Sequence, residues 1–142
     1  MTSNIVPDEF TVTSVNERLD RDGRLDDAHG SGCYALAIDV ADSVEDVERR
    51  WVRYFDVLPG NALERLAHAD RTCYVGASGD VYHRLMDHAR GDVRKASVLV
   101  AFSPERVIGV WPEDDPFDAE RSRALALRAQ GWTSWVNGEV VG

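Results

Sequence analysis

Two tyrosines, an arginine and a histidine have side chains suited to phosphate-ester chemistry. Tyr34 ends a Gly-Cys-Tyr tripeptide, Tyr74 begins a Tyr-Val-Gly tripeptide, and Arg84 follows Tyr74 by ten residues. His88 lies four residues after Arg84, so on a helix the two side chains share one face. The planar guanidinium of Arg84 suits phosphate, and His88 can orient a tyrosine or bind phosphate. A tyrosine ionises only at about pH 10, but a nearby arginine or metal ion can lower its pKa and let it relay a proton.

The elements that would hold these side chains follow from the local sequence. Apolar runs predict strands at Cys33–Val40 and Thr72–Gly76, each carrying one of the tyrosines. A helix capped by Asp80 and closed by a glycine is expected to carry both the arginine and the histidine. Because side chains alternate along a strand, Cys33 and Cys73 should point to the face opposite the tyrosines, as reduced thiols in the core.

Further elements are expected on both sides of these three. Residues 1–31 show little hydrophobic periodicity, and the polar stretch Asp20–Gly32 is typical of an exposed loop. Between the tyrosine strands, a helix capped by Ser43 and a shorter helix over 61–69 form a two-helix insertion. Its apolar stripe, expected to pack on the sheet, consists of Val44, Val47, Trp51, Tyr54, Phe55 and Leu58. The remaining patterns predict strands at 96–102 and 107–111, a helix from Asp118 to about Gln130, and a short strand within 132–141.

The alternation of strands and helices predicts an α/β or α+β fold in which helices cover one sheet. The run YVGASGDVYHRLMDH, from Tyr74 to His88, also resembles the GIY-YIG nuclease family, and the earlier Gly-Cys-Tyr tripeptide is a weaker match with Cys33 where the family usually has Ile. The resemblance covers about residues 32–137 and implies a small mixed, mainly antiparallel sheet flanked by helices. It divides the chain into an N-terminal arm, residues 1–31, and a GIY-YIG-like nuclease domain, residues 32–142.

The same resemblance implies a set of site residues. In the family, two tyrosines from adjacent strands and an arginine from the following helix surround a scissile DNA phosphate, and a glutamate on a later helix holds one divalent metal. On this chain the resemblance assigns catalysis to Tyr34, Tyr74, Arg84 and His88, substrate binding to Gly76 and Asn137, and the metal, Mg²⁺ or Mn²⁺, to Glu120.

The metal ligand departs from the family pattern. Counting back from Asn137, the expected position falls near Ala124 or Leu125, and neither side chain binds metal. Either the last helix is placed so that Glu120 serves, or the metal site is lost. The acidic loop Glu113–Asp115 offers substitute carboxylates, although such a loop in an acidic protein is commonly just solvated surface.

The charge balance bears on partners and location. The chain has 25 acidic and 16 basic residues, for a net charge of −9, and Lys95 is the single lysine among the bases. This pattern is typical of a protein from a salt-loaded cytoplasm, or of a GC-rich genome that favours arginine codons. Acidity ordinarily argues against a nucleic-acid partner, but that argument weakens in molar salt. Residues 71–106, with six bases and four acids, form the one positive segment, where an anionic ligand would dock.

No apolar run approaches the roughly 20 residues that span a bilayer, and Met1–Phe10 has no basic residue typical of a secretory signal. We therefore expect a cytoplasmic protein with no membrane partner, and DNA as its partner through the resemblance. Two functions from different classes are open: a metal-dependent DNA endonuclease, or a GIY-YIG-like module that has lost cleavage and binds nucleic acid or a protein. A small acidic domain without any nucleic-acid role is a third.

Each site residue also has a purely structural interpretation. Tyrosines in strands commonly pack in the core with the hydroxyl at its rim. Arg84 can pair with an aspartate of its own helix, and His88 can complement the dipole at the helix C-terminus. Glu120 can complement a helix N-terminus, and Asn137 can simply turn the chain. A carboxylate beside the tyrosines and Arg84 is the feature that separates the two leading functions.

Overall fold

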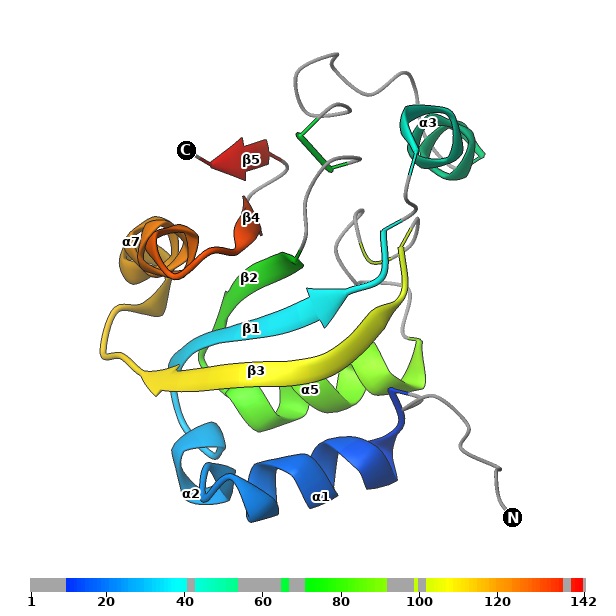
Figure 1. Cartoon of the computed structure of the whole chain (residues 1–142). Coiled ribbons are helices and arrows are strands. Elements are labelled where there is room, and N and C mark those ends of the chain that lie inside the picture. Colours follow the sequence, from blue (N-terminus) through cyan, green and yellow to red (C-terminus); the bar gives the residue numbers. More distant parts are fainter. Residues whose placement is uncertain are drawn as a thin grey trace.

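The computed structural model describes residues 10–40, 43–53, 65–66, 71–91, 99, 102–136 and 139–141. Helices and strands alternate along this part of the chain (Figure 1). The helices are α1 (Val12–Arg21), α2 (Leu25–Ala28), α3 (Val44–Val52), α5 (Val81–Arg90) and α7 (Pro116–Ala129). The strands are β1 (Gly32–Ile38), β2 (Thr72–Ser78), β3 (Pro104–Pro112), β4 (Thr133–Val136) and β5 (Glu139–Val141).

The strands form one five-stranded sheet in the order β3-β1-β2-β4-β5. Strand β1 pairs antiparallel with both β2 and β3, β4 pairs parallel with β2, and β5 pairs antiparallel with β4. The predicted small mixed, mainly antiparallel sheet flanked by helices is therefore confirmed. The two strands that carry the tyrosines are direct neighbours, and β1 is buried along its whole length.

Helices cover both faces of the sheet, as Figure 1 shows, with α1 and α5 on one side and α7 on the other. Alternate residues of β1 explain the two layers, because Leu36 packs into the cluster that holds α1 and α5 while Ala35 packs against α7. The cluster on the α7 side is the smaller one, and its members are Ala35, Cys73, Val75, Ala124, Leu127 and Val136.

Helix α5 begins and ends where its sequence predicts. The side chain of Asp80 accepts a hydrogen bond from the His83 backbone N–H at 3.1 Å, which satisfies one of the free donors of the first turn. Gly91 ends the helix in the left-handed conformation with φ of 72°, a geometry that glycine adopts without strain. These two caps fix which residues of α5 face the sheet.

The first helix of the predicted insertion is present as α3. The Ser43 side chain caps it by accepting from the Asp46 backbone N–H, and Val47 and Trp51 are buried in the same cluster as β1. Arg65 and Leu66 have helical backbone, whereas the rest of 61–69 lies outside the described residues. Tyr54, Phe55 and Leu58, also predicted as core, lie outside the described residues too.

The described residues 10–31 have more regular structure than predicted, although much of the stretch from Asp20 is exposed. Instead of an aperiodic segment with an exposed loop, the chain forms α1 and then α2, and Ala28 is fully buried. Thr11 and Ser14 form a reciprocal capping box at the start of α1. Val15 and Leu19 then lie one turn apart on the face that enters the core, so a short helical stripe was present in the sequence.

Two other boundaries differ from the predictions. The last helix begins at Pro116 with Asp115 as its N-cap residue rather than at Asp118, because proline is well suited to the first helical position. The predicted strand 96–102 is not found at its described residues, since Leu99 has helical backbone. The next strand, β3, starts earlier than expected, with Pro104 as its first residue, where a missing N–H is tolerated at the sheet edge.

Candidate functional site

The pairing of β1 and β2 brings the two tyrosines together. Tyr34 lies opposite Gly76 and Tyr74 lies opposite Leu36, so the tyrosines are diagonal neighbours on one face of the sheet. Their ring centroids are 6.2 Å apart, with the rings tilted by 58°. Tyr34 is 1% exposed, whereas Tyr74 lies at the edge of the core cluster.

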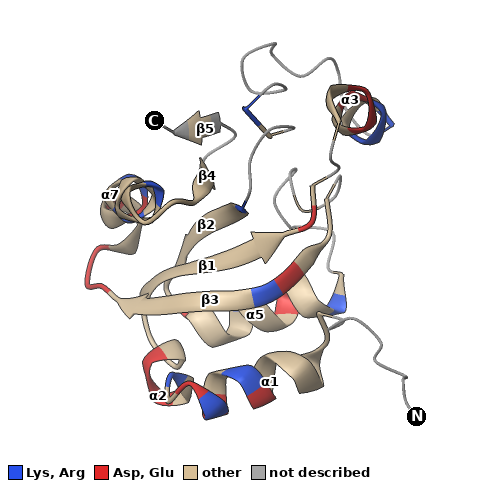
Figure 2. Ribbon diagram, viewed as in Figure 1, with Lys and Arg blue, Asp and Glu red and all other residues tan. Residues whose placement is uncertain are grey.

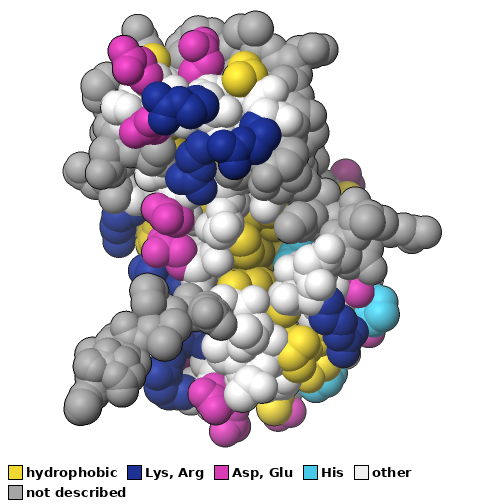
Figure 3. All heavy atoms as spheres, turned by 90° about the vertical axis from the view of Figure 1, so that its right-hand side faces the viewer, with side chains coloured by type: hydrophobic (Ala, Val, Ile, Leu, Met, Phe, Trp, Pro, Cys, Tyr) yellow, Lys and Arg dark blue, Asp and Glu magenta, His cyan; other side chains and the backbone are white. Residues whose placement is uncertain are grey.

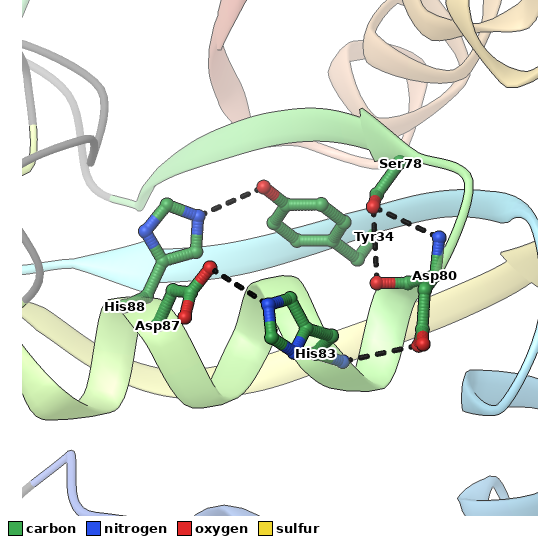
Figure 4. Close-up of polar contacts among 6 residues, drawn as sticks. All are labelled: Tyr34, Ser78, Asp80, His83, Asp87 and His88. Atoms are coloured by element: carbon green, nitrogen blue, oxygen red, sulfur yellow. Dashed lines mark hydrogen bonds and ion pairs between the residues drawn. The ribbon is translucent and has the colours of Figure 1, made fainter.

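His88 of α5 completes this cluster from the covering helix. Its Nε2 atom lies 2.8 Å from the hydroxyl oxygen of Tyr34, and its ring meets that of Tyr74 edge-on at 6.0 Å. Figure 4 shows the Tyr34 hydroxyl directed at the His88 ring. His83, one turn earlier, instead approaches Asp87 at 3.6 Å with its side chain 71% exposed, so it belongs to the surface.

Arg84 acts on the tyrosines electrostatically. Burial raises the pKa of Tyr34 well above its ordinary value, Tyr74 adds to the increase, and the charge and hydrogen bond of Arg84 oppose it. Burial likewise raises the pKa of Tyr74, with Arg84 again opposing. Arg84 therefore lowers the pKa of each tyrosine, as expected. The net pKa is nevertheless raised, contrary to the expectation, because desolvation outweighs the nearby charge. Both tyrosines are protonated at neutral pH.

Because Gly76 has no side chain, the Tyr34 ring can pack directly against its backbone. A Cβ atom at Gly76 would come within 2.5 Å of both Cζ and the hydroxyl oxygen of Tyr34. No side chain fits at this position unless the tyrosine moves. The structure thus gives Gly76 a packing role beneath Tyr34, while its predicted contact with substrate stays a prediction.

Glu120 is the carboxylate of α7 whose charge acts on Tyr74. It is 7% exposed and lies in the first half of α7, and its negative charge raises the pKa of Tyr74 and of Cys33. The two residues near the family's usual ligand position do not compete, because Ala124 is fully buried and Leu125 points outward with 43% exposure.

The edge of the sheet explains how a side chain of α7 acts on a tyrosine of the opposite face. The parallel ladder between β2 and β4 covers residues 72–74 of β2, and beyond it Val75–Ser78 are paired with β1 alone in the described part of the chain. Tyr74 therefore lies where the ladder ends, within reach of groups from both helical layers. This edge is the one place where Arg84 of α5 and Glu120 of α7 act on a common residue.

The loop before α7 does not supply a second carboxylate to this place. Glu113 lies 3.5 Å from the Arg123 guanidinium, and Asp115 forms the N-cap position of α7. Among the described residues, no group of three or more His, Cys, Asp or Glu side chains is arranged to hold a metal ion. A metal ion held by a single carboxylate such as Glu120 would need water and substrate phosphate oxygens for the rest of its shell, a mode that Mg²⁺ commonly uses.

The two cysteines lie on the opposite face, as predicted. Cys33 Sγ donates to the Pro116 carbonyl at 3.3 Å, and Cys73 lies 3.5 Å from the Ser134 hydroxyl. Both are free and fully buried thiols. They support the sheet beneath the tyrosines and do not enter the site.

Both thiols are expected to react slowly with a thiol reagent in the native protein. Burial raises the pKa of Cys33 and of Cys73 to about 11, so the thiolate fraction at neutral pH is about 100-fold below that of an ordinary thiol. Labelling followed by absorbance should be slower by at least this factor than in urea, and should accelerate as pH rises toward 11. Rapid native labelling would show that one of the strands opens locally.

Sequence reasoning missed the neighbour on the other side of Tyr74. Trp135 of β4 lies directly opposite Tyr74 in the parallel pairing, is 2% exposed, and belongs to the same core cluster. A pairing between segments sixty residues apart leaves no local signal in the sequence, so its position had to come from the fold. Asn137, predicted to bind substrate, lies outside the described residues.

No protein-family model, characterised protein or solved structure matches this chain. In the described part of the chain, no helix has both the length and the hydrophobicity needed to cross a membrane. A function for this chain is therefore inferred from the side chains of the site and their geometry.

Proposed function

We propose that the protein is a metal-dependent endonuclease of the GIY-YIG type that hydrolyses DNA phosphodiester bonds. The observation that carries this proposal is the buried Tyr34–His88 hydrogen bond, with Tyr74 packed beside it and the charges of Arg84 and Glu120 acting on Tyr74. The side chains come from two strands and two helices, and their types match what phosphodiester hydrolysis needs: a proton acceptor, a cation and a carboxylate.

The proton relay uses the Tyr34–His88 hydrogen bond. Burial keeps Tyr34 protonated, and in the His88 tautomer that carries its proton on Nδ1, the Tyr34 O–H donates this bond and Nε2 accepts it. The phenol oxygen can then take a proton from an attacking water while its own proton passes to Nε2. The water oxygen bonds to phosphorus as the bond from phosphorus to the leaving oxygen breaks, the leaving oxygen takes a proton from solvent, and no free tyrosinate is formed in the buried site. His88 thus holds the proton that water loses.

The remaining groups bind the phosphate and stabilise charge. The Arg84 guanidinium can donate two hydrogen bonds to phosphate oxygens, where negative charge grows in the transition state. Tyr74, less buried than Tyr34, presents a protonated hydroxyl that can donate to the same phosphate or to the leaving oxygen. Glu120 would hold Mg²⁺ or Mn²⁺, which when bound supplies a Lewis acid for the phosphoryl and leaving oxygens.

Cleavage by the wild-type protein tests the proposal. The folded protein, with Mg²⁺ or Mn²⁺ added, should cut supercoiled or branched DNA, and chelation should stop the reaction. The assay includes molar KCl, because an acid excess of this size is typical of proteins from a salt-loaded cytoplasm. At such concentrations salt screens the repulsion between the acidic side chains. A folded, metal-replete protein that cuts no form of DNA across the salt range would overturn it.

Glu120→Gln is expected to reduce metal-dependent cleavage by at least about 100-fold, because the amide lacks the charge that holds the cation. The same substitution should lower the pKa of Tyr74 in the absence of metal, measured by ultraviolet titration, because the charge of Glu120 raises that pKa. Glu113→Gln is the matched control, since that carboxylate pairs with Arg123 outside the site. Equal loss in both variants would remove Glu120 from the metal site.

A second candidate function is a module that binds nucleic acid without cutting it. The observation in its favour is that the described residues contain no group of three metal-binding side chains. DNA binding by the folded wild type, without cleavage in Mg²⁺ or Mn²⁺, would select this function over the first.

A further inference from the structure

The outer face of α3 carries a compact group of arginines. Arg49 and Arg50 are consecutive, and Arg53 follows them by four and three residues, so the Arg53 side chain neighbours both of the others on the helix surface. Arg53 and Arg49 are exposed, the latter with 65% of its side chain accessible. Arg50 is half-buried because its guanidinium lies 5.0 Å above the ring of Phe102.

The acids of α3 equal these arginines in number but precede them in the sequence. They all lie in the first half of the helix, and Asp46 forms an ion pair with Arg49 at 2.5 Å. The other two, Glu45 and Glu48, are exposed and belong to the first two turns, where the helix dipole favours negative charge. Figure 2 shows residues of both signs on α3, and the sequence places the arginines toward its C-terminal end.

Two tryptophans connect the inner face of α3 to the candidate site. Trp51 packs against Trp135 with ring centroids 5.5 Å apart, and Trp135 lies directly opposite Tyr74 in the sheet. Trp51 and Tyr34 also belong to one core cluster, so α3 and the site share a face of the sheet. Figure 3, which views this side, shows arginine side chains over the upper part and hydrophobic and histidine side chains in the hollow below them.

We propose that Arg49, Arg50 and Arg53 form a phosphate-binding surface that holds the DNA strand flanking the bond cut at Tyr34 and Tyr74. The inference rests on the proposed function and extends it by giving the insertion a substrate contact. The dipole of α3 accounts for basic residues near its C-terminus, but it does not require them to lie over the hollow beside the site. A DNA strand is the polyanion whose charge spacing suits several arginines in a row along a path to a scissile phosphate.

The proposal changes the interpretation of the insertion. Its apolar stripe, Val47 and Trp51 among the described residues, packs as core, as the sequence predicts. The exposed side chains Arg49 and Arg53 on its other face would contact DNA backbone, without reading bases. Contacts of this kind weaken with salt, because each bound phosphate releases counterions.

The test is the salt dependence of DNA binding, measured by fluorescence anisotropy with a labelled DNA duplex. Replacing all three arginines with glutamine should reduce the slope of log K against log salt by about two to three, since each duplex phosphate contact contributes about 0.9. The matched control removes the same charge elsewhere, through Arg21→Gln, Arg106→Gln and Arg128→Gln, and should leave the slope within one contact of wild type. Circular dichroism confirms that each variant is folded.

A single charge reversal, Arg53→Glu, provides an independent measurement. Arg53 is exposed at the end of α3, so of the three arginines it should influence packing least. It should lower affinity more than Arg128→Glu does. Equal slopes for wild type and the α3 variant would overturn the proposal while leaving the nuclease function intact. Binding that depends on α3 in a protein that never cuts DNA would support this surface and overturn the nuclease function instead.

Discussion

Replacing Arg84 with alanine is expected to reduce the rate of DNA cleavage by about 10²–10³-fold, the usual effect of losing one preorganised donor to a charged transition state. Arg84 is half-buried on the site-facing side of α5, and its charge already acts on both tyrosines in the free protein. The same guanidinium is therefore in place before substrate binds. Single-turnover cleavage rates at saturating protein measure the chemical step apart from binding.

The fold should survive the substitution, because alanine is the best helix former and the caps of α5 do not involve Arg84. Arg90→Ala is the matched control, since it removes an exposed arginine from the last turn of the same helix. It should cut at the wild-type rate within a few-fold. A second readout comes from tyrosine titration: losing Arg84 should raise the pKa of both tyrosines further. An Arg84→Ala protein that cuts DNA at the wild-type rate would exclude Arg84 from the catalytic groups.

The part of the site that the sequence predicts best is the part built from local patterns. Asp80 and Gly91 fix the two ends of α5, and its apolar stripe, with Val81 and Leu85 buried, turns His88 toward β1 and β2. The period of two in each strand then places both tyrosines on one face and both cysteines on the other. The hydrogen bond between Tyr34 and His88 follows from these local rules once the two strands pair.

The features that the sequence does not predict depend on distant contacts or on weak local signals. Helix α1 has only Val15 and Leu19 fully buried, and two residues are too few to establish a period in a polar segment. The direction of the tyrosine pKa values depends on how completely the core closes around Tyr34, which charge counting along the sequence does not reveal. The position of Glu120 depends on Pro116, which starts α7 earlier than the aspartate pattern predicts.

Replacing Trp51 with alanine is expected to destabilise the protein by about 3–5 kcal/mol, the usual range for removing a buried tryptophan. Trp51 is 9% exposed and packs on Trp135, so its loss leaves a cavity between α3 and the sheet. Equilibrium unfolding in denaturant measures the change, at a salt concentration held constant for all variants. Val52→Ala is the matched control on the same helix, because Val52 is 44% exposed, and it should change the free energy of unfolding by less than about 1 kcal/mol.

The position of Trp51 makes this substitution informative about function as well. Trp135, which Trp51 covers, lies opposite Tyr74, so a cavity there loosens the support of a residue in the candidate site. Under conditions in which the Trp51→Ala protein is still folded, we expect weaker DNA binding, because the arginines of α3 are no longer held over the site. A loss of stability well under 1 kcal/mol would contradict the core role of Trp51. It would mean that α3 docks on the sheet loosely, and that its arginines are presented to DNA by a helix that is free to move.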